Sequence, residues 1–210
     1  MPGKGKTISV VEKLDRLKLD FPNIKIVTNF GYYAEDEPLT GWQQLIDINN
    51  GENGVVFVID EVQLTFSSRD WGNFPVEILT LLTQNRKQRK LILATAQSYD
   101  RVDKIFRELT NYVIRCNTFL GRWTVNRAFL KEEYELFRQT YGQVKKAMTS
   151  WRYTYIQTDE LRTHYDTYKI LTKMERDALT GEMITLEDTR KLAISEPTSV
   201  FVNFPPKTRK

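Results

Sequence analysis

The chain has 210 residues, 40% of them hydrophobic and 12% aromatic, so it can form one ordinary domain with a substantial core and is not a disordered tail. Its 31 basic and 27 acidic residues give a net charge of +4, which is compatible with a nucleic-acid partner without establishing one. The single Cys116 and the single His164 exclude an internal disulfide and a metal site built from several cysteines or histidines. Because no apolar run is long enough for a membrane span and no signal peptide follows Met1, we expect a cytoplasmic protein without a membrane segment.

The first 130 residues alternate between helix and strand patterns. A helix is predicted over residues 8–20, where Val10, Leu14 and Leu17 share one face. Short apolar strands are predicted at residues 24–28, 55–59, 91–95, 112–118 and 123–130. Further helices are predicted at residues 39–48, from Pro75 onward and around residues 102–109. This alternation predicts an α/β fold in which a sheet lies between two layers of helices.

The rest of the chain has a different character. Residues 131–180 are charged, aromatic and mostly helical in pattern, so we expect a helical extension of a core that comprises residues 1–130. Within it, the alternating aromatic residues at 151–155 favour an amphipathic strand over a core; a ladder for stacking bases is the alternative. Residues 181–210 contain three prolines and end in basic residues, so we expect a poorly ordered tail.

The chain opens with a motif that is typical of phosphate-binding loops. Residues 2–7 (PGKGKT) match the end of the pattern G-x-x-x-x-G-K-[ST]. In such a loop Lys6 bridges the β- and γ-phosphates, Thr7 ligates Mg²⁺, and the helix from Ile8 directs its positive end at the anion. The predicted nucleotide-binding residues are Gly3, Lys4, Gly5, Lys6, Thr7 and Ile8. The first glycine of the pattern and the strand before it are missing, so a flexible basic segment is the alternative interpretation.

A second motif occurs later in the chain, at the end of the apolar run 55–59. Two carboxylates, Asp60 and Glu61, follow this run, which is the Walker B pattern. Asp60 is predicted to hold Mg²⁺ together with Thr7, and Glu61 to polarise the attacking water. An acidic turn after a core strand is the alternative. The two motifs in this order favour a P-loop NTPase that uses ATP and Mg²⁺.

Three further residues are candidates for the chemistry at the γ-phosphate. Gln97 follows the strand at 91–95, where its carboxamide can contact the γ-phosphate or the lytic water; a glutamine facing solvent is equally consistent. Arg107 and Arg115 are candidates for a cation that a neighbouring subunit supplies, although a surface ion pair is the commoner role of any single arginine.

A dense basic cluster precedes the strand at 91–95. Its members are Arg86, Lys87, Arg89 and Lys90. One interpretation is a set of contacts with the phosphate backbone of DNA. The other is a solvated helix end that the helix dipole stabilises.

Three segments together resemble the Zot-like branch of the FtsK–HerA superfamily, which contains zonular occludens toxin-like assembly proteins of filamentous phages. The segments are residues 3–7, residues 59–63 with residues 67–71 behind them, and residues 95–97. The resemblance covers roughly residues 1–130. It implies a RecA-like P-loop ATPase core that forms a homo-oligomeric ring, such as a hexamer. It also implies DNA as cargo and capsid or assembly proteins as partners.

A RecA-like sheet has the strand before the phosphate loop at its centre, so the missing first strand is expected to leave its neighbours unpaired. We therefore predict an Mg-ATP-hydrolysing motor for viral or mobile-element DNA, acting in packaging, export or virion assembly. Without a membrane segment, packaging or mobilisation is favoured over extrusion through a membrane. The alternatives are a replication helicase or loader of another P-loop branch, and a nucleotide-binding assembly protein without turnover.

Overall fold

The computed structural model of the protein describes residues 5–65, 88–140, 149–165 and 199–202, and these contain one mixed eight-stranded sheet. The strands are β1 (Lys25–Thr28), β2 (Glu37–Pro38), β3 (Val55–Ile59), β4 (Lys90–Ala96), β5 (Tyr112–Phe119), β6 (Trp123–Leu130), β7 (Trp151–Ile156) and β8 (Ser199–Val202). The helices are α1 (Lys6–Asp20), α2 (Gln43–Asp47), α3 (Val62–Thr65), α5 (Lys104–Glu108), α6 (Lys131–Gln139) and α7 (Asp159–Thr163). Two short 3-10 helices are η1 (Gly51–Asn53) and η3 (Tyr99–Arg101).

The sheet has a parallel half and an antiparallel half, in the order β2-β1-β3-β4-β8-β5-β6-β7. Strands β2, β1, β3 and β4 are parallel, so their carboxyl ends lie at one edge. Strands β5, β6 and β7 form antiparallel pairs, β5 with β6 and β6 with β7. All five residues of β3 are buried, as the apolar run 55–59 predicted for a strand covered on both faces. The predicted α/β class is confirmed.

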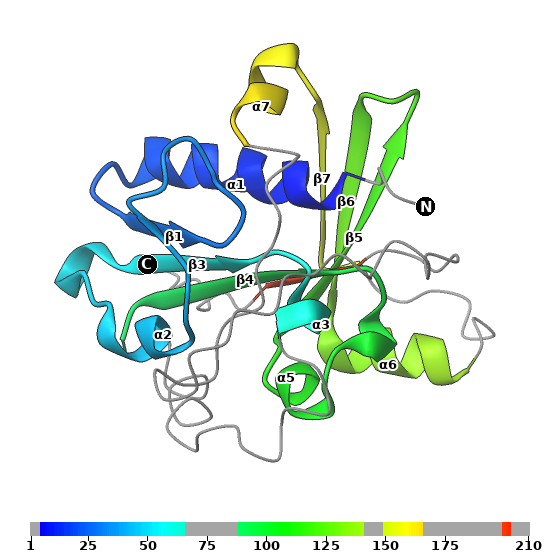
Figure 1. Ribbon diagram of the computed structural model, residues 1–210. Helices are drawn as coiled ribbons and strands as arrows, with labels where there is room; N and C mark the ends of the chain where they lie inside the picture. Colours follow the sequence, from blue (N-terminus) through cyan, green and yellow to red (C-terminus); the bar gives the residue numbers. More distant parts are fainter. Residues whose placement is uncertain (1–4, 66–87, 141–148, 166–198, 203–210) are drawn as a thin grey trace, which may run out of the picture.

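Helices cover both faces of the sheet (Figure 1). Helices α1 and α7 lie on one face, and α2, α3, α5 and α6 lie on the other. The side chains of β3 alternate between two apolar cores, with Val56 and Val58 toward α1 and Phe57 and Ile59 toward the opposite layer. The predicted apolar face of α1 is buried in the first of these cores. None of the described helices is long and apolar enough to cross a bilayer.

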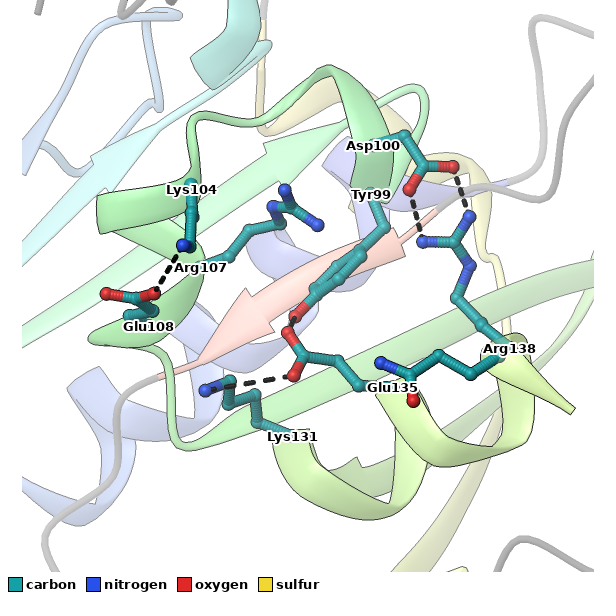
Figure 2. A pocket seen from close by; sticks show the side chains of 9 residues that line it. Tyr99, Asp100, Lys104, Arg107, Glu108, Lys131, Glu135 and Arg138 are labelled. Atoms are coloured by element: carbon teal, nitrogen blue, oxygen red, sulfur yellow. Dashed lines mark hydrogen bonds and ion pairs between the residues drawn. The ribbon is translucent and has the colours of Figure 1, made fainter.

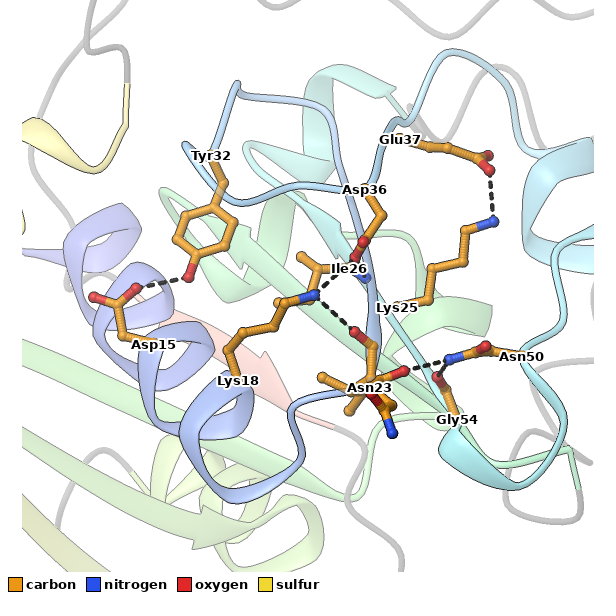
Figure 3. A network of polar contacts seen from close by, with 11 residues as sticks. Asp15, Lys18, Asn23, Lys25, Ile26, Tyr32, Asp36, Glu37, Asn50 and Gly54 are labelled. Atoms are coloured by element: carbon orange, nitrogen blue, oxygen red, sulfur yellow. Dashed lines mark hydrogen bonds and ion pairs between the residues drawn. The ribbon is translucent and has the colours of Figure 1, made fainter.

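A polar network fixes the far end of α1 to β1 and to the loop that follows it (Figure 3). The ammonium of Lys18 donates to the Ile24 carbonyl at 3.0 Å and to Asp36 at 3.1 Å. Asp36 also accepts the backbone N–H of Ile26 at 2.7 Å. One turn earlier, Asp15 accepts the hydroxyl of Tyr32 at 2.6 Å. These bonds set the direction in which α1 crosses the sheet, and therefore where its first turn lies.

The prediction of a helical extension over residues 131–180 is only partly right within the described residues. Helices α6 and α7 agree with it, but residues 151–156 form β7, which pairs with β6. The reason is the alternation of that segment, since Tyr153 and Tyr155 pack in the core beside α1 while Arg152 and Thr154 face solvent. The amphipathic-strand interpretation of this segment is thereby confirmed.

The expectation of a poorly ordered tail over residues 181–210 is wrong for residues 199–202. These form β8, which pairs antiparallel with both β4 and β5. The sequence Ser-Val-Phe-Val is rich in β-branched and aromatic residues, which favour strands, and each neighbour would otherwise present a bare row of backbone groups. Residues 181–198 and 203–210 lie outside the described residues. Strand β8 thus lies at the centre of the sheet, where unpaired neighbours were expected.

Removing residues 199–210 should destabilise the protein by several kcal/mol, because β8 pairs with two strands and each backbone hydrogen bond contributes about 1 kcal/mol net. Removing only residues 203–210 is the matched control, since every described strand pair is kept. We expect a lower and broader thermal transition by circular dichroism for the 1–198 chain than for the 1–202 chain. Equal transitions would contradict the central position of β8.

Candidate functional site

The two predicted motifs meet at the edge where the parallel strands end. The Lys6 ammonium at the start of α1 lies 2.9 Å from Oε1 of Glu61, which follows β3. The Thr7 hydroxyl lies 3.1 and 3.2 Å from the two carboxylate oxygens of Asp60. The structure therefore brings Lys6, Thr7, Asp60 and Glu61 together from two distant parts of the sequence, as the motif order predicted.

Gly5 makes the turn into α1 in a conformation that suits glycine, with a φ of +82°. A Cβ at this position would lie 2.4 Å from the Thr118 hydroxyl oxygen, which is itself hydrogen-bonded to Thr124 and Gln157. The Ser9 hydroxyl donates to the Gly5 carbonyl at 2.6 Å. Gly3 and Lys4 lie outside the described residues, and Ile8 is buried in the core rather than at the surface of the site.

The first turn of α1 offers backbone N–H groups to an anion. No side chain among the described residues caps this helix, and its first turn carries no acidic residue. The amino end of a helix has unsatisfied N–H donors and a positive dipole, which together bind phosphate well. The close approach that glycine allows at residue 5 adds to this fit. The site therefore suits the phosphates of a nucleotide.

Asp60 is held in a buried position by residues from two neighbouring strands. Its side chain accepts the Thr95 hydroxyl from β4, and the same hydroxyl accepts the Glu61 N–H at 2.9 Å. Asn29 follows β1, and its side-chain amide forms two hydrogen bonds with the backbone of Asp60. Its Oδ1 accepts the Asp60 N–H at 2.7 Å, and its Nδ2 donates to the Asp60 carbonyl at 3.1 Å. Burial raises the pKa of Asp60, and the hydrogen bond from Thr95 opposes that rise. A divalent cation bound by Asp60 and the Thr7 hydroxyl would offset the cost of burying the charge, and both are oxygen ligands of the kind that Mg²⁺ prefers.

Glu61 is held between two side chains. One carboxylate oxygen faces Lys6, and the other accepts the Nε2 of Gln63. The backbone of Glu61 has a φ of +52°, which is uncommon for a residue other than glycine and occurs frequently at active sites. Within the described residues, the Oε1 of Gln63 is buried without a hydrogen-bond partner. The carboxylate is thus positioned rather than free at the surface.

Sequence reasoning missed Asn29, Gln63 and Thr95 as site residues. Asn29 and Thr95 share a signal, because each is a polar residue at the carboxyl end of a buried parallel strand, where ligands bind. Gln63 lies within the segment 59–63 that carries the family resemblance, but the resemblance alone assigns it no role.

Within the described residues, the remaining predicted catalytic residues form no bond with the four motif residues of this site. Gln97 is exposed just after β4. Arg107 lies on α5 with its guanidinium 5.2 Å from the centre of the Tyr99 ring, and Arg115 lies within β5. Within the described residues, none of the three forms a hydrogen bond or ion pair with Lys6, Thr7, Asp60 or Glu61.

The four residues of the predicted DNA cluster differ in their surroundings. Arg86 and Lys87 lie outside the described residues, and Arg89 is exposed, with its guanidinium on the Glu52 carbonyl at 2.7 Å. The prediction of a DNA contact is wrong for Lys90, which is buried as the first residue of β4. Its ammonium donates to the Leu45 and Ile46 carbonyls at the end of α2, both at 2.8 Å, and burial lowers its pKa.

The comparisons with known proteins identify the family. The family model described as zonular occludens toxin (Zot) matches residues 33–159, more than half of the chain. The chain belongs to the Zot family. The crystal structure of the N-terminal domain of zonular occludens toxin from Neisseria meningitidis is similar, with a TM-score of 0.54 and 18% identity over 79% of this chain and 95% of that one. A comparison with curated proteins gave no match.

These findings confirm the resemblance to the Zot-like branch and the RecA-like P-loop fold. The segment that matches the Zot family contains Asp60, Glu61, Gln63 and Thr95, whereas Lys6 and Thr7 precede it. The family match therefore covers the Walker B half of the site. The contacts of α1 with that half connect the phosphate-loop motif to it.

Gly5→Ala should lower the free energy of unfolding more than Gly121→Ala does. Both glycines have a positive φ, and an alanine in the left-handed region costs about 1–2 kcal/mol. Only at Gly5 would the new methyl group also overlap a held side chain, which costs about 1–3 kcal/mol more, whereas nothing lies within 4 Å at Gly121. Urea denaturation measures the free energy of unfolding of both variants. Equal losses would show that the side chains around Gly5 move to accommodate the methyl group at little cost.

Proposed function

We propose that this Zot family protein hydrolyses ATP with Mg²⁺ and uses the energy to move viral or mobile-element DNA during packaging, export or virion assembly. The observation that supports the ATPase most strongly is the direct contact of the Lys6–Thr7 pair with the Asp60–Glu61 pair. Phosphate-binding donors and metal-binding carboxylates are thereby adjacent at the edge of a P-loop fold.

Each residue has a separate role in this proposal. The first-turn N–H groups of α1 and the ammonium of Lys6 bind phosphate oxygens. Thr7 and Asp60 hold Mg²⁺, directly or through water, and the ion supplies charge neutralisation at the transferred phosphoryl group when it is bound. Asn29 and Thr95 keep Asp60 in place. Glu61 orients and deprotonates the attacking water.

The ion pair between Lys6 and Glu61 links nucleotide binding to hydrolysis. In the structure the Lys6 ammonium rests on Glu61 at 2.9 Å. A bound γ-phosphate competes for the same ammonium, and the departure of Lys6 leaves the Glu61 carboxylate with Gln63 as its partner and able to accept a proton from water. The base is therefore released only when a phosphate is present.

Separate single substitutions of Lys6 and Glu61 test these roles. Lys6→Ala should weaken ATP binding by about 10–100-fold, because it removes a charge-assisted hydrogen bond to phosphate. Glu61→Gln should bind ATP at least as tightly as the unaltered chain, since a neutral side chain no longer holds Lys6 in an ion pair. It should lose about 10²–10⁴-fold in kcat. Binding is measured by calorimetry and kcat by phosphate release.

Lys25→Ala and Glu52→Gln are the matched controls for these two variants. Lys25 pairs with Glu37, a residue outside the site, and the Glu52 side chain is exposed. Unaltered kcat in Glu61→Gln would refute the Walker B assignment, whatever the controls show.

A ring-shaped homo-oligomer is part of the proposal. Among the described residues, Arg107 and Arg115 do not pair with the site in their own chain, which is consistent with an arginine that a neighbouring copy supplies to the phosphoryl group. We retain Arg115 for this role, because Arg107 stacks on Tyr99. Capsid or assembly proteins are the partners that would recruit such a ring to its cargo.

For DNA we propose phosphate contacts by Arg86, Lys87 and Arg89, which ignore base identity, as a motor that moves along any sequence requires. Changing all three to glutamine should reduce the slope of log affinity against log salt concentration by about one for each phosphate that is no longer neutralised. Lys90→Gln is the control, since its buried ammonium faces α2, and it should leave the slope unchanged while lowering stability. Salt titrations with two unrelated DNA sequences measure this. An unchanged slope in the triple variant would remove the cluster from the DNA path.

A further inference from the structure

A second polar pocket lies between η3, α5 and α6, on the face of the sheet opposite α1 (Figure 2). Its volume is about 470 Å³, within the range of about 300–1,000 Å³ that is usual for small-molecule sites. Four cationic side chains and three carboxylates line it, which gives the wall a net charge of one positive unit. The proposed nucleotide site does not use any of them.

The side of the pocket around Arg138 is internally satisfied. The Arg138 guanidinium pairs with both carboxylate oxygens of Asp100. The Tyr99 hydroxyl donates to the Glu135 carboxylate at 2.6 Å. Figure 2 shows the Tyr99 ring between Arg138 on one side and Arg107 on the other.

Arg107 differs from Arg138 in having no ion-pair partner among the residues that the structure describes. Its guanidinium forms no hydrogen bond or ion pair with any residue that the structure describes, and its Nε is buried without an acceptor. It rests on the face of the Tyr99 ring, which attracts a cation but does not accept its in-plane N–H groups. A buried donor without an acceptor is costly, so this group is suited to a ligand that brings acceptors.

Lys131 faces the same side of the pocket, and within the described residues its ammonium forms an ion pair with Glu135 but no hydrogen bond. Its side chain is only 16% exposed, yet its ammonium is 3.8 Å from the nearest Glu135 oxygen, beyond hydrogen-bond distance. Lys104 also lines the pocket. Its ammonium lies 3.7 Å from Oε1 of Glu108, and its side chain is mostly exposed. Figure 2 shows these two lysines and Arg107 around one space beside Tyr99.

We propose that this space binds a phosphate group, either inorganic phosphate or that of a small phosphate monoester, with Arg107 and Lys131 donating to its oxygens. A guanidinium fork and an ammonium present several donors to one compact oxyanion. The three carboxylates of the wall disfavour a polyanion such as DNA. The proposal does not depend on the function proposed for the Lys6–Glu61 site.

The test is a titration of the full chain with inorganic phosphate and, separately, with ribose 5-phosphate, at constant ionic strength, followed by ¹H–¹⁵N NMR. It is performed with the Lys6→Ala variant, so that phosphate binding at the Lys6 loop contributes as little as possible to the measured shifts. We expect amide shifts in residues 99–108 and 131–139. Saturation at lower concentration by ribose 5-phosphate identifies a monoester as the ligand, and saturation at equal or lower concentration by inorganic phosphate identifies the free ion.

Arg107→Gln should weaken this binding at least about tenfold, because it removes a charge-assisted hydrogen bond. Arg127→Gln is the matched control, since that arginine is exposed on β6 outside the pocket. Lys131→Gln provides the same test if the Arg107 variant loses its dispersed NMR spectrum. Shifts confined to the phosphate loop, or affinities within twofold of the control in the folded variants, would overturn the proposal.

Discussion

The contact between the first turn of α1 and the carboxyl end of β3 is the constraint on which the site depends. It requires the chain to turn sharply into α1 at Gly5, with a positive φ and with Thr118 close to where a Cβ would lie. The far end of the same helix is fixed by Lys18 and Asp15. Because both ends of α1 are fixed, Lys6 and Thr7 face Asp60 and Glu61.

The second requirement is a carboxylate that stays in place despite burial. Asp60 is 8% exposed, and burial favours its neutral form. The hydroxyls of Thr7 and Thr95 donate to it, and the Asn29 amide holds its backbone. These partners come from α1, β4 and the end of β1. A parallel sheet provides such convergence directly, because the carboxyl ends of neighbouring strands lie at one edge.

Local patterns were sufficient for β1, β3 and β4 of the parallel half and for the motif residues, but they did not predict the two-residue strand β2. The apolar run before Asp60 specified β3, and the spacing of Leu14 and Leu17 specified the buried face of α1. The failures concern pairings between distant segments. Nothing near Lys90 in the sequence indicates that its ammonium meets the end of α2. Likewise, nothing near residues 199–202 indicates that two strands from elsewhere will enclose them. Such contacts depend on topology, which a local pattern does not specify.

The central position of β8 connects the site to the far end of the chain. Asp60 and Glu61 belong to the parallel half, whereas Gly5 packs against Thr118 and Gln157 of the antiparallel half. The site therefore spans both halves, and β8 is the strand that joins them through its pairs with β4 and β5. Since neighbouring strands lie about 4.8 Å apart, one strand more or less between β4 and β5 changes the separation of the two halves by that amount. A contact of 2.9 Å between Lys6 and Glu61 does not tolerate such a change, so the geometry of the phosphate site depends on a strand more than a hundred residues away in sequence.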